Sequence, residues 1–230
     1  MKFPFNVIDL THPLSTDIPS WDMYCGFQCT NTLDYEDCTT DVKFRIQNLK
    51  LPAGIGTHID APAHCIASGK SIDQLSLNEL IAPCVIVDVS NKAHETYQCL
   101  ISDIDTHEHK YGKIPKKSFV IIYTGWDKYW KNTMQYRNNL QFPSVSKEVA
   151  SLLLERDIVG LGIDTLSPDT EKSGYPVHHT LLSSGKYIIE NIANSTQLPT
   201  MGSFAMGLPL PIVHGTEAPM RLIALIPRDV

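Results

Sequence analysis

Short runs of β-branched, mostly apolar residues recur along this 230-residue chain, and they constrain its fold more than any other feature. Runs of this length and composition are typical of buried strands, because β-branched side chains pack well on a pleated surface. No internal repeat accompanies them. The five runs that predict strands are residues 85–89, 119–123, 158–163, 187–190 and 222–226.

Two helices are predicted between these strands. Apolar residues after Ser146 follow the spacing of one helical face, so residues 146–156 predict an amphipathic helix that begins at a serine cap. Ser76 and Glu79 have the spacing of a capping box, which predicts a shorter helix that continues to Ile81. Strands and helices together predict a mixed α/β (α+β) class.

Length and charge narrow the class of protein further. No Gly/Ser linker or low-complexity tract divides the chain, so residues 1–230 are expected to form one domain. With 19 Lys and Arg against 25 Asp and Glu and no basic block, nucleic acid is not an expected partner. No apolar run approaches the roughly 20 residues of a membrane span, and the N-terminus lacks a signal-peptide pattern. We therefore expect a cytoplasmic protein with no membrane contact.

The six cysteines fall at irregular spacings in a chain too large to need disulfide staples, so free thiols are expected. A metal knuckle is conceivable at Cys25, Cys29 and Cys38, but this group contains no Cys-x-x-Cys pair. Reduced cysteines are the favoured interpretation. The remaining cysteines are Cys65, Cys84 and Cys99.

Residues 54–64, with the sequence GIGTHIDAPAH, concentrate three metal-competent side chains in seven residues. In an extended segment residues i and i+2 point the same way, so His58 and Asp60 are expected side by side. Pro62 disfavours a helix here. A histidine beside an aspartate suits zinc, manganese or iron, and both ligands bind deprotonated. His64 is the third member of the group.

A second cluster lies more than a hundred residues later. The adjacent pair His178 and His179 is followed, across a predicted turn, by Glu190 inside an apolar run. Glutamate is rarely buried without a partner, so Glu190 predicts a nearby cation. The alternative is that Glu190 faces solvent at a strand end and that the two histidines belong to a loop. Three other histidines are expected at the surface: His94, His107 and His109.

Two predicted strands run into polar segments, at residues 124–126 and 164–167. Binding sites often gather at such strand ends, which favours a substrate role for Trp126 and Asp164. The alternative is structural, since Thr-Gly is typical of turns, Trp126 can cover the core, and Asp164 can cap a helix.

Together the segments GTHIDAPAH at residues 56–64, PVHHTLL at 176–182 and ENI at 190–192 resemble the metal-dependent cyclase family, which contains bacterial kynurenine formamidase and isatin hydrolase. The GTHxDxPxH element is the specific part of this resemblance, and the other pieces are individually weak. The resemblance spans nearly the whole chain. Its weaker pieces are residues 9–14, 18–21, 123–126, 162–167 and 215–221.

The resemblance implies a swivelling β/β/α domain that assembles as a homodimer or a higher homo-oligomer. It implies a divalent metal, zinc first and manganese as the alternative. His64 is then the catalytic acid/base, and His179 is a neighbour of the site. The metal ligands that it implies are His58, Asp60, His178 and Glu190.

The activity implied by the resemblance is hydrolysis of an aryl formamide, such as N-formylkynurenine, to an arylamine and formate, a step of tryptophan catabolism. A bound metal lowers the pKa of its water to about 7, and His64 carries the proton between water and leaving nitrogen. Trp21 or Trp126 is expected to stack on the aryl ring. The alternatives are an isatin-type cyclic amide hydrolase on the same site and a small-molecule-binding protein without catalysis.

One position departs from the family pattern. Four residues before His58, where the family usually has another histidine ligand, this chain has Gly54. An ion with only two protein ligands is short of the three usual for catalytic zinc, so we expect one tight ion per chain and a second that is weak or absent. A Gly54→His variant is then expected to retain more metal. His12 and His179 are the open candidates for a replacement ligand, although His12 is expected to pack under the site.

Overall fold

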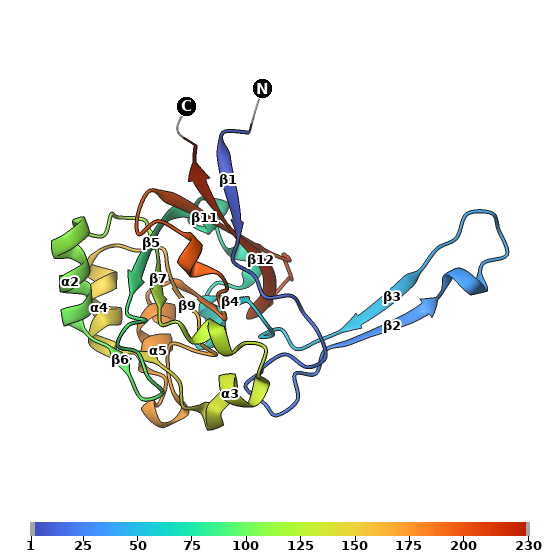
Figure 1. Ribbon diagram of the computed structural model, residues 1–230, viewed down its shortest axis with the longest axis horizontal. Coiled ribbons are helices and arrows are strands. Elements are labelled where there is room, and N and C mark those ends of the chain that lie inside the picture. The colour runs from blue at the N-terminus through green and yellow to red at the C-terminus, as the bar shows by residue number, and fades with distance from the viewer. Residues whose placement is uncertain (1–2, 229–230) are drawn as a thin grey trace.

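The computed structural model describes residues 3–228, and a sheet that closes into a barrel forms its centre (Figure 1). Within these residues the strand order is β1-β12-β11-β5-β7-β9-β10-β4, and β12 also pairs with β4. This extra pairing closes seven strands into a ring, with β1 outside it along β12. The strands are β1 (Phe5–Asp9), β4 (His58–Asp60), β5 (Ile81–Asp88), β7 (Phe119–Tyr123), β9 (Gly160–Ile163), β10 (Tyr187–Glu190), β11 (Ser203–Pro209) and β12 (Glu217–Pro227).

The barrel wall separates two apolar clusters. Along β7, Phe119 and Ile121 point into the barrel interior, whereas Val120 and Ile122 point outward into the layer under the helices. This alternation follows from the period of two along a strand. Because both faces are covered, all five residues of β7 are buried, which explains why this strand reads as a continuous apolar run in the sequence.

Three helices cover one side of the barrel, where α2 and α4 lie side by side and α5 lies next to them (Figure 1). Ser146 caps α4 by accepting a hydrogen bond from the Val149 N–H, as the sequence predicts. The helix predicted from Ser76 is a single turn that ends before Ile81, because Ile81 pairs with β11 as the first residue of β5. The helices are α1 (Leu77–Leu80), α2 (Ile101–Tyr111), α3 (Thr133–Arg137), α4 (Lys147–Glu155) and α5 (Pro176–Ser183).

Strand bounds agree with the sequence at two of the five predicted runs and differ at the others. The predicted bounds of β7 and β10 are confirmed. β9 is fully buried but begins at Gly160, two residues after the start of the predicted run 158–163. β5 and β12 begin several residues before the predicted runs, since their first halves alternate buried and exposed positions and do not read as apolar runs. The mixed α/β class is confirmed, and the closure of the sheet into a barrel was not predicted.

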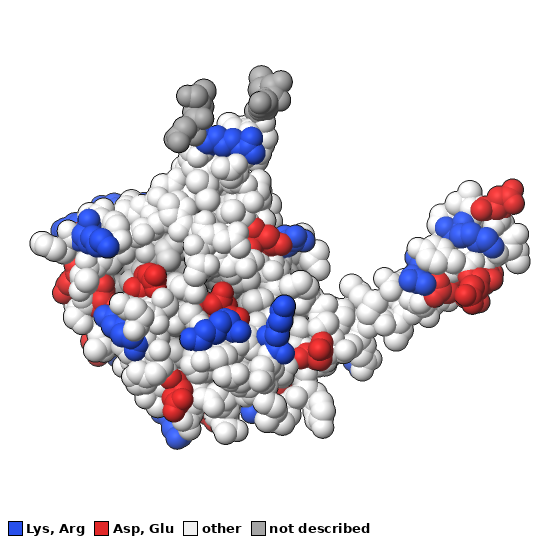
Figure 2. Space-filling model, in the orientation of Figure 1, with Lys and Arg blue, Asp and Glu red and all other residues white. Residues whose placement is uncertain are grey.

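A two-stranded arm projects from the barrel (Figure 1). It consists of β2 (Gln28–Leu33), β3 (Ile46–Lys50) and the connecting residues 34–45. The two strands pair antiparallel, and every residue of β3 is exposed. Figure 2 shows charged side chains gathered at the far end of the arm and few along its shaft. A short parallel pair, β6 (Gln98–Cys99) and β8 (Ser144–Val145), completes the strands of residues 3–228.

The cysteines are free thiols, as predicted. Within the described residues, none of the groups that could hold a metal ion contains Cys25, Cys29 or Cys38. His94 and His109 are exposed as expected, but the surface prediction for His107 is wrong, because its ring is buried on α2. Between residues 3 and 228, no helix has the length and apolarity needed to cross a bilayer.

Candidate active site

The site is organised by β4, which lies between β10 and β12. His58 is paired directly with Glu190 of β10, and Asp60 is paired directly with Glu217 of β12. Residues directly opposite each other project from the same face of a sheet, so these four side chains meet on one face. The prediction that His58 and Asp60 lie side by side is confirmed, with Nε2 and Oδ1 3.4 Å apart.

Helix α5 brings His178 to this face. The helix begins at Pro176 without a side-chain cap from its N-cap residue, and Asp169 instead accepts hydrogen bonds from the N–H groups of Val177 and His178. The same carboxylate lies 2.8 Å from Nδ1 of the His178 ring. The interpretation of the histidine pair as part of a loop is therefore wrong, because residues 176–183 form a helix that Asp169 anchors.

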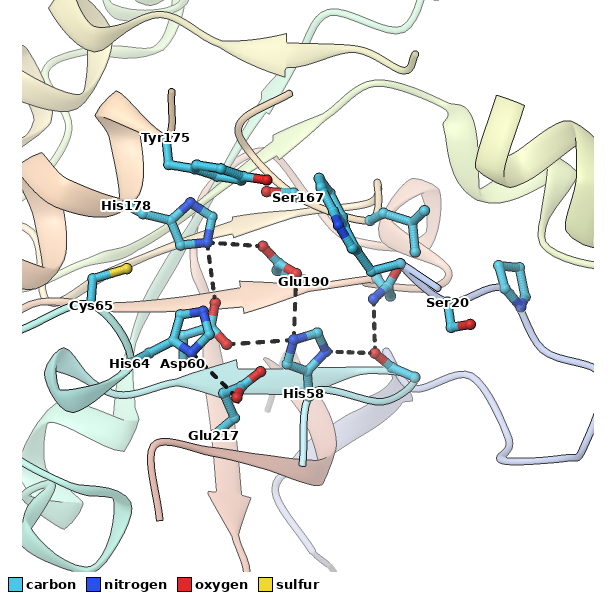
Figure 3. Close-up of a pocket in the computed structure, with 16 residues that line it drawn as sticks. Ser20, His58, Asp60, His64, Cys65, Ser167, Tyr175, His178, Glu190 and Glu217 are labelled. Carbon is cyan, nitrogen blue, oxygen red and sulfur yellow. Dashed lines mark hydrogen bonds and ion pairs between the residues drawn. The ribbon is translucent and has the colours of Figure 1, made fainter. Parts of the chain in front are cut away.

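Two imidazoles and two carboxylates form a closed ring in this cluster (Figure 3). The His58 Nε2 atom lies 3.4 Å from Asp60 Oδ1 and 3.4 Å from Glu190 Oε2. The His178 Nε2 atom lies 3.5 Å from Asp60 Oδ2 and 3.4 Å from Glu190 Oε1. Two atoms bound about 2.1 Å from one ion at a tetrahedral angle are about 3.4 Å apart. The ring therefore has the spacing of ligands around a divalent cation.

Both imidazoles are oriented by hydrogen bonds on the side away from the ring. Nδ1 of His58 lies 2.9 Å from the carbonyl oxygen of Gly56, and Nδ1 of His178 faces the Asp169 carboxylate. When each Nδ1 donates its proton outward, each Nε2 presents a lone pair to carboxylate oxygens. Asp60 Oδ1 and Glu190 Oε1 are buried without a hydrogen-bond partner. A divalent cation bound among these groups would satisfy them, so these residues fit zinc or manganese.

The pKa values in the cluster reflect the same need for positive charge. Burial alone would lower the pKa of His58, but Asp60 and Glu190 outweigh burial and raise this pKa to about 9. Burial also opposes protonation of His178, yet Asp169, Asp60 and Glu190 hold its pKa well above the usual value. A metal ion bound by the neutral imidazoles would supply this charge, and its uptake would displace protons.

His64 lies at the edge of the cluster, in the short 3₁₀ turn Pro62–His64 that follows β4. Its Nδ1 atom is 3.3 Å from Glu217 Oε2, and this contact raises the pKa of His64. About a third of the His64 side chain is exposed, at 33%. Asp60, His64 and His178 also lie close enough together to hold an ion as a group. His64 is therefore both near the centre and reachable from solvent.

The cluster forms the floor of a cavity of about 360 Å³, a volume in the range of small-molecule sites. Trp21, Tyr175 and Leu166 supply an aromatic and apolar wall, and Cys65 lies at the side of His178 (Figure 3). Among the described residues that line the cavity, none is lysine or arginine. The four side chains of the ring thus face a pocket suited to a small aromatic molecule.

The prediction that Trp126 contacts substrate is wrong. Its indole is buried among Tyr136, Phe142 and Leu166, and its N–H donates to the Tyr136 carbonyl. Asp164 accepts hydrogen bonds from the N–H groups of Thr124 and Trp126, so its carboxylate holds the turn after β7. The structural alternative is therefore the correct one for this segment. Trp21, the other predicted aromatic contact, does line the cavity.

The structure also places the two histidines whose roles the sequence left open. The His12 ring stacks on Trp130 with ring centroids 3.9 Å apart, and the His12 backbone N–H donates to the Thr57 hydroxyl, so the residue packs under the start of β4. His179 is exposed on α5. Neither residue lines the cavity.

Sequence reasoning missed two carboxylates of the site, Asp169 and Glu217. Asp169 lies nine residues before His178 with no local pattern that joins them. Glu217 belongs to the segment 215–221, which supports the family resemblance but carried no assigned role. Its signal in the sequence is a lone acidic residue at the start of an apolar strand.

Comparison with known proteins identifies relatives over most of the chain. Residues 8–170 match the family model described as "Putative cyclase". Isatin hydrolase of Roseibium aggregatum is 30% identical over 189 residues, which cover 75% of this chain and 72% of that protein. Kynurenine formamidase of Bacillus mycoides is 25% identical over 222 residues, which cover 94% of this chain and 95% of the relative.

Solved structures show the same fold. Isatin hydrolase A of Labrenzia aggregata, bound to benzyl benzoate, is 27% identical and superposes with a TM-score of 0.88 over 98% of this chain and 95% of its own. A potential metal-dependent hydrolase with cyclase activity is 25% identical, with a TM-score of 0.76 over 98% of this chain and 100% of its own. With a family model matched over more than half of its length, this chain belongs to the cyclase family.

Proposed function

We propose that this protein is a metal-dependent hydrolase that cleaves the C–N bond of an aryl amide, with an aryl formamide such as N-formylkynurenine as the first candidate. The observation that carries the proposal is the pair of outward-anchored imidazoles whose Nε2 atoms face two buried carboxylates in a cavity. Relatives named kynurenine formamidase and isatin hydrolase, and a solved structure described as a metal-dependent hydrolase, support it.

The proposed chemistry divides between the metal and the chain. When bound by the predicted ligands His58, Asp60, His178 and Glu190, the metal supplies an acidified water and polarises the carbonyl. His64 keeps its Nδ1 toward Glu217, so the proton that it takes up and returns to the departing nitrogen is held at Nε2. Trp21 and Tyr175 orient the aryl ring against the apolar wall.

A second candidate is the opening of a neutral cyclic amide of the isatin type. Among its described lining residues the cavity has three carboxylates and no basic side chain, so an α-carboxylate such as that of N-formylkynurenine lacks an arginine or lysine partner there. A neutral substrate has no such charge to compensate. The similarity to isatin hydrolases points the same way.

Three substrates separate these possibilities. We expect the zinc- or manganese-loaded protein to hydrolyse aryl formamides best. Formanilide is an aryl formamide without a carboxylate, so comparing its kcat/KM with that of N-formylkynurenine shows whether the α-carboxylate is tolerated. Ultraviolet assays with N-formylkynurenine, formanilide and isatin measure kcat/KM for each. Faster turnover of isatin would assign the second candidate instead. Binding without turnover of all three would contradict the proposal and favour a binding protein.

A homodimer or higher homo-oligomer is part of the proposal, and the arm supports it. An isolated two-stranded ribbon is at best marginally stable in water, and this one exposes several large apolar side chains. A second copy of the chain is the proposed partner that covers them. The exposed apolar residues of the arm include Val42, Phe44, Ile46 and Leu49.

Light scattering tests this assembly. The natural protein is expected to have at least twice the 25.7 kDa mass of one chain, and the double variant Phe44→Ser/Leu49→Ser is expected to shift toward that single-chain mass. Met134→Ser, an exposed apolar residue on α3 away from the arm, is the matched control. A monomeric natural protein would rule the assembly out.

A cytoplasmic location also remains a proposal. The free thiols of all six cysteines are compatible with a reducing compartment. Fractionation of the cells that express the protein tests it directly.

A further inference from the structure

We propose that Glu217 is the ligand of a second metal ion, in the space that a side chain at position 54 would otherwise occupy. A Cβ atom built on Gly54 would lie 2.1 Å from Glu217 Oε1 and 3.4 Å from His58 Nε2. The carboxylate and the imidazole thus flank the same space. This inference rests on the metal-dependent function proposed above, and it assigns a ligand that the sequence did not reveal.

Strand pairing places Glu217 directly against the cluster. Glu217 and Asp60 are directly opposite each other on β12 and β4, and two like charges in this position repel unless a cation lies between them. No lysine or arginine among the described lining residues neutralises the pair. The two carboxylate oxygens of Glu217 face different neighbours: Oε2 faces His64, and Oε1 faces the space above Gly54.

The cluster itself divides into two halves. Asp60 turns Oδ1 toward His58 and Oδ2 toward His178, and Glu190 likewise offers one oxygen to each imidazole. A carboxylate held in this way can bridge two ions. Glu217 lies on the His58 side, where Asp60 Oδ1 has no hydrogen-bond partner.

Each ion then has three protein ligands, the number usual for catalytic zinc. Asp60, His178 and Glu190 hold one ion. His58, Asp60 and Glu217 hold the other. The weak second ion expected from Gly54 alone is therefore replaced by a second ion that Glu217 retains.

The close approach to Gly54 gives a further consequence. A side chain at position 54 and the Glu217 carboxylate exclude each other, because 2.1 Å is well inside van der Waals contact. The single variant Gly54→His should therefore displace the carboxylate rather than add a ligand to the natural set. The two residues act as alternative ways to complete the same ion position.

Metal content after extensive dialysis tests the proposal without reference to activity. The natural protein is expected to retain about two zinc ions per chain, and Glu217→Gln about one. Zinc titration calorimetry should show that the affinity for one ion falls by at least the roughly 10–100-fold typical of a lost outer-shell partner, with the other ion unaffected. Glu148→Gln, an exposed glutamate on α4, is the matched control. Circular dichroism confirms that each variant is folded.

The double variant Gly54→His/Glu217→Ala moves the ligand to the other side of the same space. It is expected to regain the second ion that Glu217→Ala loses. Equal zinc content and affinity in the natural protein and in Glu217→Gln would overturn the proposal and leave Glu217 only as the partner of His64. Failure of every form, the natural protein included, to bind zinc would instead overturn the metal-dependent function.

Discussion

Removal of bound metal should lower the rate of amide hydrolysis by at least about 10³-fold, and added zinc or manganese should restore it. The metal is the only group proposed to acidify water and polarise the carbonyl. These two effects lower the activation free energy by several kcal/mol, and each 1.4 kcal/mol corresponds to roughly a tenfold change in rate. Rates measured before chelation, after chelation and dialysis, and after stoichiometric addition of each metal check this result. Hydrolysis at the full rate by metal-free protein would contradict it.

Rebinding of the metal provides an independent readout. The pKa of His58 is about 9 in the metal-free cluster, so near pH 7 its ring carries a proton that must leave when the ion binds. Zinc uptake at this pH should release protons, and the apparent affinity should fall as the pH is lowered from about 9, because protons compete with the ion. Calorimetry in buffers with different ionisation enthalpies measures this release. As a companion variant, His178→Ala should retain less metal, because it removes one of the proposed ligands.

Replacement of the proposed acid/base should have the second-largest effect. His64→Ala is expected to lower kcat by roughly 10²–10⁴-fold, the usual worth of a positioned proton-transfer group. Metal content should be unchanged, because the imidazole of His64 is not part of the ring that His58, Asp60, His178 and Glu190 form. Turnover and metal analysis on the same preparation test both statements.

A matched control is available on the neighbouring helix. His179→Ala removes an exposed imidazole that does not line the cavity, so it should retain both activity and metal. Loss of metal in His64→Ala would reassign this residue as a ligand, because Asp60, His64 and His178 lie close enough to share an ion.

The sequence predicts those structural features that depend only on residues a few positions apart in the chain. His58 and Asp60 lie side by side because residues two apart share a face of any strand. The buried strand Phe119–Tyr123 appears in the sequence as an apolar run. Ser146 caps α4 by accepting a hydrogen bond from a residue only three positions later. The metal-competent segment was therefore recognisable from its spacing alone.

Family resemblance joined His178 and Glu190 to that segment, and only the tertiary structure shows how they meet. His58 and Glu190 are 132 positions apart in the chain, and the pairing of β4 with β10 sets them directly opposite. A one-residue shift in this register would turn one of them to the other face. Local patterns do not determine such a register, because it is set by closure of the barrel around its core.

The errors have the same origin. The position of Trp126 after a strand end predicts a contact with substrate. The direction of its ring depends instead on packing against Tyr136 and Phe142, which the local sequence pattern does not reveal. Glu217 was overlooked because its neighbour Asp60 lies on a strand 157 positions earlier. The chain's stereochemistry determines which residues share a face within one strand, whereas the packing of the whole core determines which strands become neighbours and which carboxylates share one cavity.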